Sequence, residues 1–176
     1  VYEIHTMGNL ATLFWYENAY EAALDLARQA LERCEEAGLS LERRLPLGDM
    51  GAAALALHAI ELARQCLEES LALAQQTGDR TQEILCLTHL GWLSIRVKRP
   101  AEALGYLGRA LALAQRIGSC TEQSWLHSGL AEAHRLAGDP VQALAHATQS
   151  RERAQQTGAA YDQKLAGWVL DRIDRA

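Results

Sequence analysis

Glycine recurs at a fixed spacing of forty residues along this chain, at Gly38, Gly78, Gly118 and Gly158. A period of this length is typical of repeat architectures, in which each unit buries its apolar face only against its neighbours. Small residues recur at the same spacing, so the period extends well beyond the glycines. These columns lie fifteen, eight and four residues before each glycine: Ala23, Ala63, Ala103 and Ala143; Ala30, Ser70, Ala110 and Ser150; Cys34, Ala74, Ala114 and Ala154.

The third period predicts two helices in each unit. Asp79 is a helix-capping residue with Gln82 three positions on, and an apolar pattern then continues to Val97. Pro100 is suited to the first position of a second helix, because its missing N–H costs nothing there. Gly118 ends that helix, as a residue in the left-handed conformation commonly does.

The other periods follow the same scheme with different turn residues. In the fourth, Ser119 and Glu122 match a capping box, and the Gly138–Pro140 segment predicts the turn between the helices. In the second, no helix breaker occurs near His58. Only the period predicts a turn there.

A further column of small residues falls inside the first helix of each unit. Glycine in a helix interior costs about 1 kcal/mol relative to alanine, so Gly51 and Gly91 indicate that another backbone approaches closely. Replacing Gly91 with leucine is therefore expected to overpack the stack by about 1–3 kcal/mol. This column and the residue before each of its members are Leu10-Ala11, Met50-Gly51, Leu90-Gly91 and Leu130-Ala131.

The columns resemble the tetratricopeptide repeat, whose pattern places Leu-Gly in the first helix and two alanines in the second. Leu90-Gly91, Ala103 and Ala110 fit that pattern at the family's spacing. The resemblance implies an all-α, right-handed α-solenoid of four helix-turn-helix repeats plus a C-terminal capping helix. We expect one solenoid over residues 1–176, as a piece of a larger protein. The expected repeats are approximately 1–38, 41–78, 80–118 and 120–158, and the capping helix is approximately 160–174.

Two phrases, Cys66–Asp79 and Leu90–Leu93, look like the long arrays of large bacterial LuxR-type and ATP-dependent transcriptional activators. That resemblance implies a cytoplasmic, non-enzymatic sensor or interaction platform of a regulator. Its partner would be a protein, a peptide or another domain of the same protein. Two alternatives remain open: a sensor for a small molecule or peptide pheromone, with the ligand near Trp92, and a structural oligomerisation scaffold.

The family's concave groove is lined by the first helix of each repeat, so the resemblance also implies which residues face a ligand. Trp92 and Arg96 are four positions apart and share a helix face, and such a pair is typical of binding hot spots. The implied groove residues are Asn9, Thr12, Tyr16, Asp49, Ala52, His89, Trp92, Arg96, Ser128 and Glu132.

Composition and motifs argue against several other functions. The net charge of -5 provides no basic footprint for nucleic acid, and no apolar run is long enough to span a bilayer. The sequence contains no GxSxG, P-loop or HExxH motif, so we expect no enzyme and no cofactor. His127 and His134, without a nearby carboxylate or thiol, make a poor metal site, and His146 is expected to be isolated.

The ends of the array are expected to be its less covered parts. At the N-terminal end, Ile4, Phe14 and Trp15 are predicted to lack a neighbour and to favour a homodimer. At the C-terminal end, charged residues that include Arg172 are predicted to keep the capping helix soluble.

Overall fold

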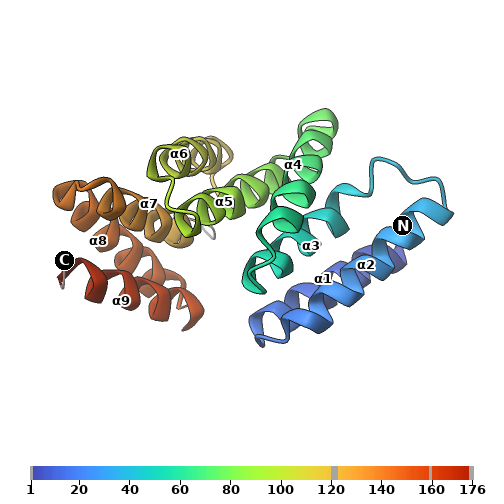
Figure 1. Cartoon of the computed structure of the whole chain (residues 1–176), viewed down its shortest axis with the longest axis horizontal. Helices are drawn as coiled ribbons and strands as arrows, with labels where there is room; N and C mark the ends of the chain where they lie inside the picture. The colour runs from blue at the N-terminus through green and yellow to red at the C-terminus, as the bar shows by residue number, and fades with distance from the viewer. Residues whose placement is uncertain (1, 120–122, 159, 175–176) are drawn as a thin grey trace. The chain divides into compact units, whose positions relative to one another are not determined.

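The structure is a computed structural model that describes residues 2–119, 123–158 and 160–174. Across these ranges the chain forms nine helices and no strand, in line with the all-α expectation (Figure 1). The helices are α1 (Tyr2–Tyr16), α2 (Tyr20–Glu36), α3 (Arg44–Ala56), α4 (Ile60–Thr77), α5 (Arg80–Arg96), α6 (Pro100–Ile117), α7 (Gln123–Ala137), α8 (Pro140–Thr157) and α9 (Ala160–Asp174).

Successive helices pack in adjacent pairs, as in a tetratricopeptide solenoid. α1 packs on α2, α3 on α4 and α7 on α8, while α9 packs on both α7 and α8. The chain divides into two compact units, residues 1–89 and residues 90–176, with the boundary inside α5.

The periodic glycines have the backbone conformation that the sequence predicts. Gly78, Gly118 and Gly158 follow α4, α6 and α8 with φ of +72°, +70° and +71°, and Gly38 lies just beyond α2 with φ of +66°. L side chains rarely adopt this left-handed region, which explains why the period is most visible at these glycines.

A second left-handed series, also spaced by forty residues, forms the turn between the two helices of each pair. Only Gly138 in this series is a glycine, so the series is not visible as a repeated residue in the sequence. The turn at His58 that only the period predicted is confirmed. The members are Asn18, His58, Lys98 and Gly138, with φ of 61°, 64°, 57° and 79°.

The predicted helix starts are also confirmed where the structure describes them. The Asp79 Oδ1 accepts a hydrogen bond of 3.0 Å from the Gln82 backbone N–H. Pro100 and Pro140 occupy the first positions of α6 and α8. The capping box expected at Ser119 includes Glu122, which lies outside the described residues.

Gly51 and Gly91 lie where a side chain from the paired helix fills the space. A Cβ on Gly91 would lie 2.5 Å from the Leu107 Cγ, and a Cβ on Gly51 would lie 2.5 Å from the Leu67 Cγ. The close approach is therefore mainly that of a leucine side chain, which corrects the expectation of a backbone. The equivalent positions of the first and fourth pairs hold two alanines each: Ala11 with Ala27, and Ala131 with Ala147.

The exposed apolar residues of α1 differ from those expected. Ile4 is buried, and Phe14 and Trp15 are half-buried, because α2 and α3 cover that side of the helix. Leu10 and Leu13 are exposed instead. The sequence alone does not distinguish these two faces, since both are apolar.

Candidate functional site

The structure distributes the ten residues implied by the resemblance over three environments. Four are exposed, three are half-buried and three are buried, so they do not form one uniform surface. In that order they are Asn9, Thr12, Tyr16 and Arg96; Asp49, Ala52 and Trp92; His89, Ser128 and Glu132.

In residues 1–89 the open positions lie on α1 and α3, which pack against each other. Asn9, Thr12 and Tyr16 follow one another along α1, and Asp49 and Ala52 lie one turn apart on α3. We call these five residues the α1–α3 face.

Glycine at position 8 brings the Asp49 carboxylate close to α1. The Asp49 Oδ2 lies 3.2 Å from the point that a Cβ on Gly8 would occupy. A larger residue at that position would have to displace the carboxylate. The carboxylate of Asp49 therefore packs against the backbone of α1.

Trp15 borders this face, although the resemblance did not point to it. Its Nε1 donates a long hydrogen bond of 3.4 Å to the Ala52 carbonyl. Its ring also meets the rings of Tyr16, Tyr20 and His89 edge to face, at centroid distances of 5.4, 6.2 and 6.4 Å.

Burial shifts the two titratable groups of this region in opposite directions. It raises the pKa of the Asp49 carboxyl from an ordinary 3.8 to about 7, because desolvation penalises the charged form. It lowers the pKa of His89 to about 4 for the same reason, partly opposed by the contact of 2.9 Å between its Nδ1 and the Leu85 carbonyl oxygen. At neutral pH His89 is therefore uncharged.

The Asp49 shift predicts an unusual dependence of stability on pH. Between pH 4 and 7 the folded chain holds a proton on Asp49 that the unfolded chain has released, so stability falls as the pH rises. Asp49→Asn should remove this loss and increase the free energy of unfolding at pH 8 by about 1–3 kcal/mol. Urea denaturation at pH 5 and pH 8 measures it. A gain of equal size at both pH values would contradict it.

In residues 90–176, Trp92 packs against α7 instead of standing in solvent. Its Cε2 lies 3.4 Å from the Cβ position of Gly129, and its Nε1 is buried without a hydrogen-bond partner among the described residues. Arg96, one turn further along α5, is exposed. The two side chains thus share a helix face but not an environment.

Ser128 and Glu132 have structural partners. The Ser128 and Ser150 hydroxyl oxygens are 2.7 Å apart, which joins α7 to α8. The Glu132 carboxylate accepts hydrogen bonds from Arg135 at 2.7 and 2.8 Å and from Arg172 of α9 at 2.8 Å. Arg172, expected only to aid solubility, therefore fastens α9 to α7.

Three histidines form a ladder of stacked rings between α7 and α8. His146 stacks on His127 and on His134, at centroid distances of 5.2 and 5.4 Å. The Nδ1 atoms of His127 and His146 are 3.0 Å apart. The expectation that His146 is isolated is wrong. His127 and His134 lie two turns apart on α7, and the His146 ring from α8 lies between their rings. In the described ranges no group of three or more His, Cys, Asp or Glu could hold a metal ion.

The ladder predicts a loss of stability in acid. Burial, and secondarily the neighbouring His146, lower the pKa of His127 to about 4. Between pH 6.5 and 4, His127 is therefore protonated in the unfolded chain but not in the folded chain. Stability falls as the pH falls through this range. His127→Phe should reduce the loss between pH 7 and pH 5 by about 1–2 kcal/mol. Denaturant titrations of the variant and of the unmodified chain at the two pH values provide the measurement, and an unchanged pH dependence in His127→Phe would count against the effect.

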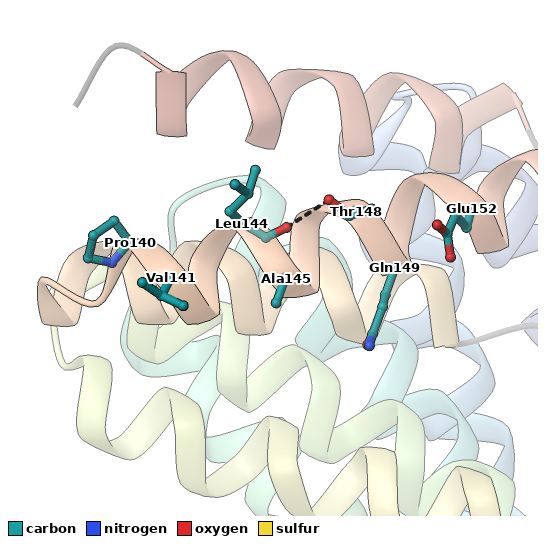
Figure 2. Close-up of a pocket in the computed structure, with 7 residues that line it drawn as sticks. All are labelled: Pro140, Val141, Leu144, Ala145, Thr148, Gln149 and Glu152. Atoms are coloured by element: carbon teal, nitrogen blue, oxygen red, sulfur yellow. Dashed lines mark hydrogen bonds between the residues drawn. The ribbon is translucent and has the colours of Figure 1, made fainter.

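An exposed apolar surface lies on α8 (Figure 2). The residues of this surface border an open hollow of about 720 Å³, and Val141 and Leu144 are 74% and 49% exposed. All of them come from the one helix, so the hollow is an open helix face and not an enclosed cavity. They are Pro140, Val141, Leu144, Ala145, Thr148, Gln149 and Glu152.

Two further properties concern residues outside these sites. No helix in the described part of the chain has the length and apolar character needed to cross a membrane. Cys34, Cys66 and Cys86 are buried free thiols, and burial raises the pKa of Cys86 to about 12. Such a thiol is poorly reactive, because the thiolate is the nucleophile. Cys120 lies outside the described residues.

Models of the tetratricopeptide repeat match residues 43–116 and 93–156, and a second model with the same description matches residues 4–37. These matches cover most of the sequence, so the chain belongs to the tetratricopeptide-repeat family. A search of curated protein sequences returns no match.

Solved structures agree with the family assignment at the level of the fold. Aspartyl phosphate phosphatase F from Bacillus subtilis superposes with a TM-score of 0.77 over 95% of this chain, at 15% identity. A putative kinesin light chain from Podosopora anserina with nearly identical TPR-like repeats superposes with a TM-score of 0.71 over 98% of this chain, at 16% identity. The chain spans 45% of the phosphatase and 85% of the kinesin light chain in those two structures.

Proposed function

We propose that this chain is a non-catalytic module that binds a peptide or an extended segment of a partner protein, and that the α1–α3 face is part of its binding surface. Tetratricopeptide repeats are generally protein-interaction modules, and the family match therefore favours binding over catalysis. The observation that carries the proposal is the combination of exposed polar and aromatic side chains on α1 with the Asp49 carboxylate on α3.

The composition of this face is suited to a peptide. Tyr16 is 57% exposed, and Thr12 and Asn9 offer a hydroxyl and an amide beside it. A peptide has polar groups along its whole backbone and needs such partners at short intervals. These positions differ from repeat to repeat, whereas the buried columns recur, so selectivity would reside in the face and stability in the columns.

Selection from a random peptide library on the immobilised chain tests the proposal. Selected peptides should bind the chain with micromolar or tighter dissociation constants, measured by calorimetry. Thr12→Arg places a bulky charge on the face and should weaken binding at least tenfold, while Gln29→Arg on the exposed side of α2 should not. Equal effects of the two substitutions, or no selected binder, would refute it.

We further propose that this binding module serves a larger cytoplasmic bacterial transcriptional regulator. Its support is the resemblance of the segment Cys66–Asp79 to the arrays of such regulators. The sequence of the complete gene product is the test. A neighbouring ATP-binding module together with a helix-turn-helix module would support the regulator, and the absence of both from the complete product would refute it.

A further inference from the structure

We propose that the Asp49 carboxylate anchors a cationic group of the bound peptide, which is an amino terminus or a lysine or arginine side chain. This inference rests on the proposed peptide-binding function of the α1–α3 face and names the ligand chemistry that the face selects.

Asp49 has no partner among the described residues of its own protein. Among the described residues no hydrogen bond or ion pair reaches its carboxylate. A carboxylate removed from water without a partner is costly, and proteins therefore usually pair it. Burial accordingly raises the pKa of the Asp49 carboxyl to about 7. A cation arriving from outside would relieve this cost.

The two arginines at the start of α3, the helix that carries Asp49, are already engaged with other carboxylates. The Arg44 guanidinium donates to Asp79 at 3.0 Å and to Glu42 at 2.9 Å. Arg43 pairs with Glu69 at 2.9 Å. Because these arginines neutralise other carboxylates, the charge on Asp49 remains unmatched.

The surroundings of Asp49 favour a cation. Trp15 and Tyr16 provide aromatic rings at the border of the face, and their ring centroids are 5.4 Å apart. Aromatic rings attract ammonium and guanidinium groups, most strongly where water is partly excluded. His89, with its pKa near 4, adds no positive charge that would repel a cation. The site thus combines one carboxylate with an aromatic border.

The Asp49 carboxylate is also accessible to a ligand. Asp49 is half-buried and therefore still reached by solvent, although its Oδ2 packs against α1 at Gly8. A charge-assisted hydrogen bond in such a partly desolvated place is stronger than one in open water. Small changes in the cation of a ligand should therefore have large effects on its affinity.

The test uses four pools of random hexapeptides labelled with fluorescein at the carboxyl end. The pools combine a free or acetylated amino terminus with a central lysine or its neutral analogue norleucine. Fluorescence polarisation with the full chain gives an apparent dissociation constant for each pool. We expect the doubly cationic pool to bind at least tenfold more tightly than the doubly neutral pool, and the two mixed pools to show whether the terminus or the side chain supplies the cation.

Three variants complete the test. Asp49→Asn should abolish the preference for cationic pools, and Asp49→Glu should restore part of it. Asp25→Asn, at an exposed residue of α2 that pairs with Arg28, changes the net charge equally and should leave the preference intact. Thermal denaturation establishes that each variant is folded.

The outcomes separate the two proposals. Equal binding of all pools, or a preference that survives Asp49→Asn, overturns the anchor while peptide binding stands. If no pool binds the unmodified chain, the proposed function fails and the anchor fails with it.

Discussion

Leu107→Ala is expected to lower the free energy of unfolding by about 2–5 kcal/mol, as large-to-small changes in a packed core do. Gly91→Ala should cost about 1–3 kcal/mol, because its Cβ would lie 2.5 Å from the Leu107 Cγ. The double variant Gly91→Ala/Leu107→Ala should be markedly more stable than the sum of the two losses predicts. It recreates the alanine pair found at Ala131 and Ala147.

Urea denaturation of the two single variants and the double variant measures this coupling, which should be about 1–3 kcal/mol. Gly105→Ala is the matched control on α6, since a Cβ there meets no heavy atom within 4 Å. Alanine is the better helix former, so this control should be neutral or stabilising by up to about 1 kcal/mol. Strict additivity of the losses at positions 91 and 107 would contradict the packing argument.

The second large effect is expected at Glu132. Glu132→Gln keeps the volume but removes a carboxylate that is 2% exposed and binds Arg135 and Arg172. Breaking a buried ion pair leaves charges without partners, and because both arginines are partly exposed we expect a loss of about 2–3 kcal/mol. The loss should be concentrated in α9, which Arg172 fastens to α7.

Hydrogen exchange of α9 amides, together with denaturant unfolding, provides the measurement. Glu102→Gln is the control, because its pair with Arg99 is exposed on α6 and should contribute well under about 1 kcal/mol. If protection of α9 is unchanged in Glu132→Gln, the ion pairs do not hold the helix. A loss in the Glu102→Gln control of similar size would assign the effect to net charge instead.

The helical pairs were predictable because their signals are local. A residue such as Pro100 at a helix start, or Gly118 after a helix end, restricts its own backbone, and the forty-residue period then applied each local signal to all repeats. Even the turn at His58 followed from the period alone, although its left-handed φ of 64° is uncommon for a residue other than glycine.

The site was less predictable because it depends on which side chains cover one another. The family's pattern assigns Ser128 to the groove, yet its hydroxyl is hydrogen-bonded to the Ser150 hydroxyl. The Glu132 carboxylate is bound by Arg172, which lies forty residues further along the chain, in the next period. The position of the Asp49 carboxylate likewise depends on Gly8, which lets it lie close to α1. None of these facts is a property of one residue or of its spacing.

The packing of Leu107 also limits how such an array is recombined. This side chain fills the space left by Gly91 in its own pair and also approaches Gly129 of the following pair, where a Cβ would lie 2.9 Å from its Cδ1. Moving α6 into a pair that carries alanine at position 91 would produce a clash, and moving α8 opposite Gly91 would leave a void. Repeats of equal length are thus not interchangeable. Duplication or exchange of a repeat conserves the fold only when both helices of the pair are moved as a unit and the following helix has a small residue where Leu107 approaches it.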